Sequence, residues 1–155
     1  MAGGDIVTAP KRRTPKKLGA QKRPARVPHG KGEAEQERPL VLLVDDDTDY
    51  LSRVANELSN AGLRVVTASS SAEAIRHLEL AKPDVGLLDL MMPATSGLDL
   101  LKDIKGLAPK TPVVVVSALW DDEMGAKARK AGAADYLVKP VSSEVLQIEV
   151  LAHLL

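Results

Sequence analysis

The stretch VGLLDLMMP, Val85–Pro93, decides the fold because it joins a short apolar run to one acidic residue and a proline. Its first four residues are continuously apolar, which is typical of a strand buried on both faces of a parallel sheet. Asp89 follows at once, and a carboxylate at the end of a buried strand is costly unless a site uses it. The stretch therefore predicts a buried strand that delivers Asp89 to a functional edge.

Three other apolar runs end in polar residues in the same way. They are Leu40–Val44 before Asp45, Asp46 and Asp47, Val113–Val116 before Ser117, and Tyr136–Val138 before Lys139 and Pro140. In an open parallel sheet, ligands bind beyond the carboxyl ends of the strands, where these polar residues would meet. The four strand ends are therefore interpreted as one site.

Amphipathic stretches separate the apolar runs and predict helices between the strands. Strands are expected at residues 40–44, 64–68, 85–88, 113–116 and 135–138. Helices are expected at about residues 48–61, after a cap at Ser71 with Ala72, Ile75 and Leu78 buried, at about 98–105 before Gly106, from Asp121 or Asp122 to Gly132, and from a cap at Ser142 or Ser143 onward. Five strand–helix units predict an α/β fold, a doubly wound five-stranded parallel sheet with helices on both faces.

Length and composition set further bounds on the function. The 155 residues suit one domain, and the lack of cysteine excludes disulfides and thiolate metal sites. The sequence contains neither an apolar run of membrane-spanning length nor a signal-peptide core, so a cytoplasmic location is expected. The zero net charge hides an asymmetry, since residues 1–38 carry a net +6 and residues 39–155 a net −6.

Residues 1–38 are expected to form a disordered, basic, proline-rich tail ahead of a domain at residues 39–155. The tail holds four prolines and few large apolar residues, too few to offset the entropy of ordering. Its basic clusters could make weak, non-specific contact with nucleic acid. Alternatively, the tail is solvated or docks on the acidic domain; the sequence leaves these possibilities open.

Four segments in order resemble the receiver domain of bacterial two-component response regulators, in particular the single-domain receivers of chemotaxis. They are LLVDDD (Leu42–Asp47), DVGLLDLMMPATSGLDLL (Asp84–Leu101), VVVVSA (Val113–Ala118) and DYLVKP (Asp135–Pro140). The resemblance covers residues 39–155 and implies the flavodoxin-like strand order 2-1-3-4-5.

The resemblance also implies a phosphorylation site with a bound Mg²⁺. Asp89 matches the aspartate that accepts the phosphoryl group. Asp46, Asp89 and the backbone carbonyl of Met91 are the expected metal ligands, with Asp45 acting through water. Lys139 supplies a positive charge to the phosphoryl group and is joined to the next residue, Pro140, by a cis peptide bond.

A switch is implied at two further positions. Ser117 matches the hydroxyl that contacts the phosphoryl group, and Tyr136 matches the aromatic residue that moves into the space Ser117 leaves. Asp47 is expected to be a helix cap rather than a site residue. Trp120 is interpreted either as an exposed anchor for a partner or as packing.

The first functional expectation is a receiver that takes a phosphoryl group from a sensor histidine kinase or a histidine phosphotransfer protein. It would signal by binding a downstream protein through the last two helices and the strand between them, catalysing only its own phosphorylation and dephosphorylation. The alternatives are a phosphorelay shuttle, or the receiver part of a larger regulator or hybrid kinase. A phosphatase with an aspartate nucleophile is disfavoured, because Asp45, Asp47 and Thr48 miss the Asp-x-Asp-x-Thr spacing by one residue.

Overall fold

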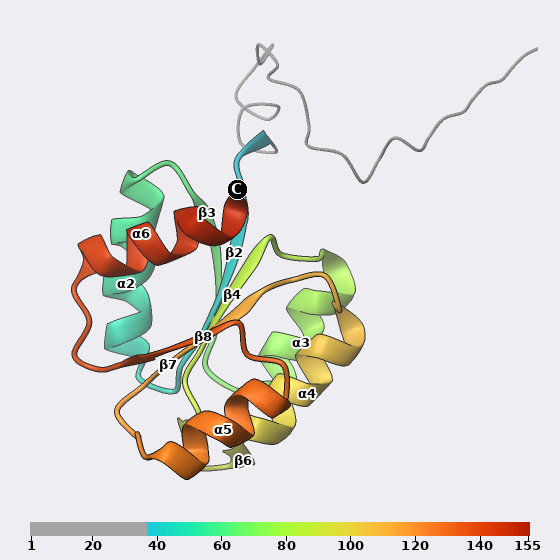
Figure 1. Cartoon of the computed structure of the whole chain (residues 1–155). Helices are drawn as coiled ribbons and strands as arrows, with labels where there is room; N and C mark the ends of the chain where they lie inside the picture. Colours follow the sequence, from blue (N-terminus) through green and yellow to red (C-terminus); the bar gives the residue numbers. More distant parts are fainter. Residues whose placement is uncertain (1–36) are drawn as a thin grey trace, which may run out of the picture.

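The computed structural model describes residues 37–155, so the predictions for residues 1–36 lie outside the described part of the chain (Figure 1). The elements are β2 (Leu40–Val44), α2 (Thr48–Asn60), β3 (Arg64–Ala68), α3 (Ser71–Leu80), β4 (Val85–Leu88), β5 (Met91–Met92), β6 (Thr95–Ser96), α4 (Gly97–Leu107), β7 (Val113–Ser117), α5 (Asp122–Lys130), β8 (Asp135–Val138) and α6 (Ser143–Leu154).

Five strands form one parallel sheet in the order β3-β2-β4-β7-β8. Counted along the five strands, this is the order 2-1-3-4-5, so the flavodoxin-like fold is confirmed. The register pairs Val44 with Leu88, and Ser117 with Val138. The residues that follow these strands therefore leave the same edge of the sheet.

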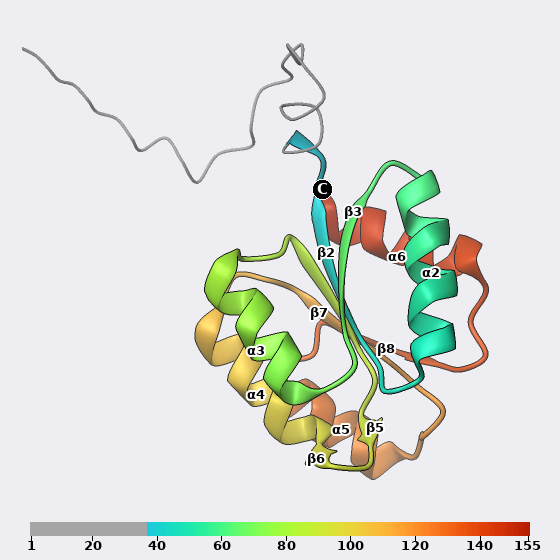
Figure 2. The ribbon, with the colours of Figure 1, turned by 180° about the vertical axis from the view of Figure 1, so that it is seen from behind.

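Helices cover both faces of the sheet and explain the continuous apolar runs. Helices α2 and α6 lie on one face and α3, α4 and α5 on the other (Figures 1 and 2). Side chains of β2 alternate between two hydrophobic cores: Val41 and Leu43 pack towards α2 and α6, while Leu42 and Val44 pack towards the other three helices. Because both faces are covered, every residue of β2 is buried.

Most helix caps follow the prediction, and one differs by a residue. Asp47 caps α2 by accepting a hydrogen bond from the backbone N–H of Tyr50 at 3.1 Å, and Asp121 and Ser142 cap α5 and α6. Helix α3 is capped by Ser70 rather than Ser71, because Ser70 Oγ accepts from the N–H of Glu73.

Two other expectations for the helices were wrong. Ala72 is exposed, and α3 instead buries Ala74 and Leu78 against the sheet, with Ile75 partly buried. Gly106 does not end α4, which continues to Leu107. Gly106 is exposed, and a Cβ at this position would contact no other atom. Glycine there therefore destabilises the helix only through its conformational entropy.

The connection between β4 and α4 is tightly built. It contains a short antiparallel pair, β5 with β6, that was not predicted from the sequence because two-residue strands carry no periodic signal. Gly97 opens α4, and a Cβ at this position would overlap the backbone of Leu90. The glycine thus allows the start of the helix to touch the residue directly after Asp89.

Candidate functional site

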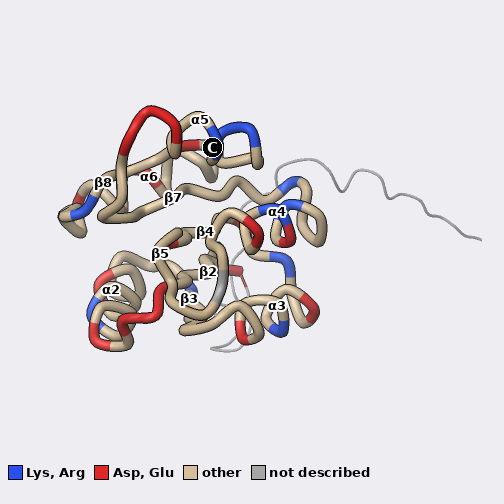
Figure 3. Tube along the Cα trace, turned by 90° about the horizontal axis from the view of Figure 1, so that it is seen from below, with Lys and Arg blue, Asp and Glu red and all other residues tan. Residues whose placement is uncertain are grey.

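Three carboxylates from two strand ends meet at the carboxyl edge of the sheet. One oxygen from each of Asp45, Asp46 and Asp89 lies within 4.8 Å of the other two. Asp45 and Asp89 are buried, whereas Asp46 is exposed. Figure 3 looks onto this edge, where the run of aspartates after β2 forms the red stretch that leads into α2. The structure therefore brings together the three acids singled out in the sequence.

Lys139 joins the two buried acids. Its Nζ lies 2.5 Å from Asp45 Oδ2 and 3.3 Å from Asp89 Oδ2. Its backbone N–H donates to the carbonyl of Ser117 at 2.9 Å, and the peptide bond to Pro140 is cis, as predicted. Burial disfavours the ammonium group, but the two carboxylates outweigh that effect and raise the pKa of Lys139.

The two oxygens of Asp45 are already engaged. Oδ1 accepts a hydrogen bond from the backbone N–H of Asp47 at 3.0 Å, and Oδ2 accepts from Lys139. Burial raises the pKa of Asp45, and the Lys139 ammonium only partly offsets this. Such a carboxylate is better suited to contact a cation through water than to bind it directly.

Tyr50, in the first turn of α2, is a site residue that the sequence analysis missed. The Nζ of Lys139 lies 4.2 Å from the centroid of the Tyr50 ring, within range of a cation–π interaction. Burial raises the pKa of the Tyr50 hydroxyl, while Lys139 opposes the shift. Only the folded chain brings α2 beside the segment after β8, so no local pattern could have identified this residue.

Ser117 and Tyr136 meet at the backbone of Leu119. Ser117 is fully buried, and its Oγ accepts from the N–H of Leu119 at 3.3 Å. The Tyr136 hydroxyl donates to the carbonyl of the same residue. Burial raises the pKa of Tyr136. The two predicted switch residues are thus linked through a single loop residue.

Met91 contacts the central acid through its backbone. Its N–H donates to Asp89 Oδ1 at 2.9 Å, and its side chain is half exposed. This bond fixes the Asp89 carboxylate against the loop that follows β4. The role of the Met91 carbonyl as a metal ligand stays a prediction.

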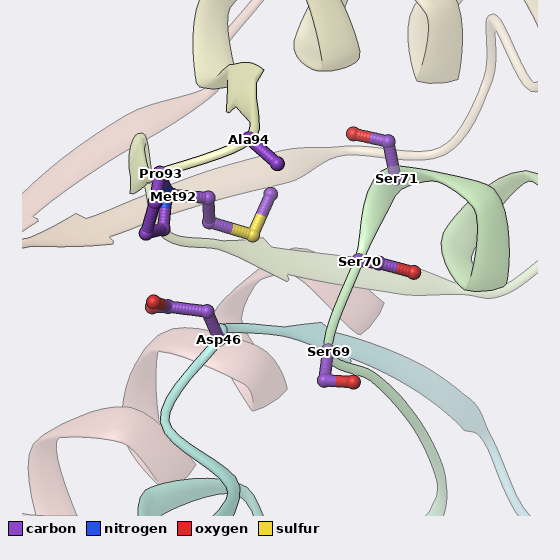
Figure 4. A pocket seen from close by; sticks show the side chains of 7 residues that line it. All are labelled: Asp46, Ser69, Ser70, Ser71, Met92, Pro93 and Ala94. Atoms are coloured by element: carbon purple, nitrogen blue, oxygen red, sulfur yellow. The ribbon is translucent and has the colours of Figure 1, made fainter.

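A cavity of about 180 Å³ opens beside Asp46. Three groups of residues line the cavity (Figure 4). They are Asp46 after β2, the serines Ser69, Ser70 and Ser71 at the start of α3, and Met92, Pro93 and Ala94 after β4. The hydroxyl oxygen of Ser71 is buried without a hydrogen-bond partner in the structure. The cavity has room for several water molecules, at about 30 Å³ each.

The donor set fits a hard divalent cation. Its side chains offer carboxylate oxygens only, the ligand type that Mg²⁺ and Ca²⁺ prefer. Mg²⁺ also keeps several of its waters, which the adjoining cavity can accommodate. The residues present are therefore compatible with a magnesium site.

Comparison with known families identifies this arrangement. A family model described as the response regulator receiver domain matches residues 41–151. The chain belongs to the response regulator receiver family. Residues 41–151 include the three acids, Ser117, Tyr136 and Lys139, so the match covers the whole site of the receiver.

Curated relatives of this receiver are regulators of transcription. The chain is 41% identical over 101 residues to the transcriptional regulatory protein KdpE of Mycobacterium tuberculosis, covering 65% of this chain and 44% of KdpE. It is 39% identical over 104 residues to the DNA-binding transcriptional regulator NtrC of Escherichia coli, covering 67% of this chain and 22% of NtrC. The receiver thus spans less than half the length of these relatives.

Solved structures of receivers share the fold. A CheY-like receiver domain protein from Methanospirillum hungatei has a TM-score of 0.74 at 27% identity, covering 76% of this chain and 94% of that one. A response regulator from Burkholderia pseudomallei, with a phosphorylated aspartic acid, calcium ion and citrate, has a TM-score of 0.69 at 27% identity, covering 76% of this chain and 66% of that one.

A second group of ligand-type side chains lies at the opposite edge of the receiver sheet. Asp135 begins β8 and lies close to Glu149 and His153 of α6, with His153 Nε2 3.2 Å from Glu149 Oε2. A hydrogen bond between the two carboxyl groups lowers the pKa of Asp135 and raises that of Glu149.

Across residues 37–155, none of the helices combines the length and apolar character needed to cross a membrane.

Proposed function

We propose that Asp89 accepts a phosphoryl group from a histidine kinase, or from a histidine phosphotransfer protein, in a magnesium-dependent reaction. The observation that carries the proposal is the setting of this carboxylate. Asp89 is buried within 4.8 Å of two other acids, yet Lys139 reaches it with a positive charge at 3.3 Å. A buried acid held between carboxylates and an ammonium group is suited to receive a group that bears negative charge.

The reaction is a transfer between two side chains. One oxygen of Asp89 attacks phosphorus, the bond between phosphorus and the donor's imidazole nitrogen breaks, and that nitrogen keeps the electron pair. Lys139 then balances charge on the phosphoryl oxygens, and Met91 N–H holds the carboxylate in orientation. The receiver catalyses only this transfer to itself and the later hydrolysis.

Mg²⁺ would be held by Asp46, Asp89 and the carbonyl of Met91, with Asp45 contacting it through water. When bound, the cation reduces the repulsion between Asp89 and the incoming phosphoryl oxygens. Support comes from the oxygen-only donor set and from the cavity beside Asp46. The two engaged oxygens of Asp45 favour an indirect contact at that residue.

The output of the receiver follows from Ser117 and Tyr136. Phosphoryl oxygens on Asp89 attract the Ser117 hydroxyl and draw it away from Leu119 N–H. The Tyr136 hydroxyl is hydrogen-bonded to the carbonyl of Leu119, so a shift of Leu119 also shifts Tyr136. We infer that this changes the surface formed by α5, β8 and α6, where a downstream protein binds.

In this scheme the receiver acts either alone or within a longer chain, and the length of its relatives favours the longer chain. The relatives KdpE and NtrC are DNA-binding or transcriptional regulators more than twice as long as the matched region. A second candidate function is therefore the input part of a transcriptional regulator, in which Asp89 phosphorylation controls an attached domain. Transfer from the phosphorylated receiver to a histidine phosphotransfer protein would instead support a phosphorelay shuttle.

Phosphorylation by a small phosphodonor, measured by intact mass, tests the proposal. The unaltered chain is expected to gain one phosphoryl adduct that requires Mg²⁺, and Asp89→Asn is expected to gain none. Asp135→Asn is the matched control, since it alters an acid of the other cluster. An adduct that persists in Asp89→Asn would contradict the assignment, as would equal loss in Asp135→Asn.

A further inference from the structure

Trp120, the only tryptophan of the chain, packs against the switch tyrosine. Its ring meets the Tyr136 ring edge to face, with centroids 5.1 Å apart and an interplanar angle of 76°. This is a favourable arrangement for two aromatic rings. Trp120 remains 44% exposed, so it forms the outer cover of Tyr136 rather than part of the core.

The Trp120 ring also lies against Gly125 in α5. A Cβ at position 125 would lie 2.7 Å from two carbons of the indole ring, closer than real contacts allow. Glycine inside a helix is unfavourable relative to alanine. Gly125 therefore has a packing reason, because only a residue without a side chain leaves room for Trp120.

The residue before Trp120 holds both switch side chains. The carbonyl of Leu119 accepts from the Tyr136 hydroxyl, and its N–H donates to Ser117 Oγ. Tyr136 is thus held at its hydroxyl by Leu119 and at its ring by Trp120, two consecutive residues of one loop. A displacement of Trp120 removes the ring contact without altering any group that touches Asp89.

We propose that Trp120 is a positioning residue that holds Tyr136 in its packed position, so that Trp120 and Gly125 set how readily the receiver adopts its phosphoryl-bound arrangement. The inference rests on the proposed function, in which the phosphoryl-bound arrangement has Tyr136 packed inward against the loop of Ser117 and Leu119. Tyr136 already packs against the core beside Ser117 and Leu119. An interaction that stabilises this position favours every ligand that binds the same arrangement more tightly.

Gly125→Ala displaces Trp120, and Gly106→Ala is its matched control. Both variants replace a helical glycine and gain the same helix propensity, but a Cβ at position 106 meets nothing within 4 Å. The chain has only two tyrosines, so labelling with 3-fluorotyrosine gives one fluorine signal each for Tyr50 and Tyr136. Trp120 emission reports on the indole in the same samples.

Without ligand, Gly125→Ala and Trp120→Ala are expected to move the Tyr136 fluorine signal and leave that of Tyr50 in place. Trp120→Phe, which keeps an aromatic ring, should recover at least part of the change. Emission of Trp120 should shift to longer wavelength in Gly125→Ala, and Gly106→Ala should match the unaltered chain in every reading. A Tyr136 signal unchanged in Gly125→Ala would overturn the inference, whether or not the indole moves.

The second measurement is binding of beryllofluoride, a phosphoryl analogue, in the presence of Mg²⁺. Gly125→Ala should bind it about two- to tenfold more weakly, the range expected for loss of one aromatic pair, while Gly106→Ala should bind as the unaltered chain does. Equal affinity in Gly125→Ala would reject the inference. Failure of the unaltered chain to bind would reject the proposed function instead, and the fluorine signals would still decide whether Trp120 positions Tyr136.

Discussion

The receiver carries two clusters of acidic side chains at opposite edges of its sheet, and they differ in burial and in counter-charge. At the carboxyl edge, the buried Asp45 and Asp89 share the ammonium group of Lys139. At the amino edge, Asp135 is exposed and Glu149 is paired with an imidazole on its own helix. Both clusters contain three ligand-type groups within 4.8 Å of one another.

Proximity of acidic side chains therefore does not by itself make a functional site. Charge concentrated in a buried edge is costly, so the fold must neutralise it with Lys139 and, in the proposed function, with a cation. The cluster at the amino edge is only partly buried and contains the imidazole of His153, so it needs neither the lysine nor a cation. Equivalent substitutions in the two clusters should therefore have different effects on ion binding and on stability.

Magnesium binding is expected to distinguish the two clusters first. Asp46→Asn should lower the affinity for Mg²⁺ at least about tenfold, because it removes a proposed ligand charge. Asp135→Asn, the equivalent change in the other cluster, should leave the affinity unaltered. Isothermal titration of both variants with Mg²⁺ checks this, and equal losses would mean that the two clusters bind the ion alike.

Removal of the positive partner should also affect the stability of the two clusters differently. Lys139→Met leaves two buried carboxylates unpaired and is expected to lower the free energy of unfolding by about 3 kcal/mol without Mg²⁺. His153→Ala should change it by about 0.5 kcal/mol or less. Urea unfolding gives both values. Added Mg²⁺ should restore part of the loss in Lys139→Met only; no restoration would argue against a cation at this edge.

The rim of the carboxyl edge should set the lifetime of the phosphoryl group. Met91 and Leu119 lie two positions after Asp89 and Ser117, and apolar side chains there cannot orient an attacking water. A lifetime of minutes or longer is therefore expected, with Met91→Asn shortening it about threefold or more. Loss of the adduct, followed by intact mass, provides the measurement. A half-life of seconds in the unaltered chain would contradict the expectation.

The smallest effect is expected at the amino-edge cluster of Asp135, Glu149 and His153, and it depends on pH. The bond to Asp135 raises the pKa of Glu149, so its contribution to stability is present below the unfolded pKa and is lost as pH rises through the folded one. The lowered pKa of Asp135 gives the opposite dependence at lower pH. Above both values the two carboxylates repel each other.

Glu149→Gln keeps a donor to Asp135 at every pH. Relative to the unaltered chain, the variant should gain less than about 1 kcal/mol at pH 7 and less still at pH 4.5. Urea unfolding at the two pH values measures the difference. A gain that is the same at both would show that the pair does not titrate as one unit.

The sequence predicted the sheet and most of the site because both follow from strand ends. Each apolar run became a strand within one residue, and Asp45, Asp89 and Lys139 met as expected because parallel strands share one edge. The sequence did not reveal Tyr50, whose ring reaches Lys139 only through tertiary packing. The predicted cap of α3 was Ser71 rather than Ser70, because each of the three consecutive serines can cap a helix that begins directly after it.

The touching backbones of Gly97 and Leu90 also have a consequence for how such receivers can diverge. Because no side chain fits at position 97, the backbone at the start of α4 stays in contact with Leu90. This contact fixes the length of the loop between Asp89 and α4. An insertion or deletion between these residues would shift Asp89 relative to the lysine on another loop. Among receivers that have this contact, sequence changes should therefore accumulate on the outer surfaces of the helices, while the number of residues between Asp89 and α4 stays constant.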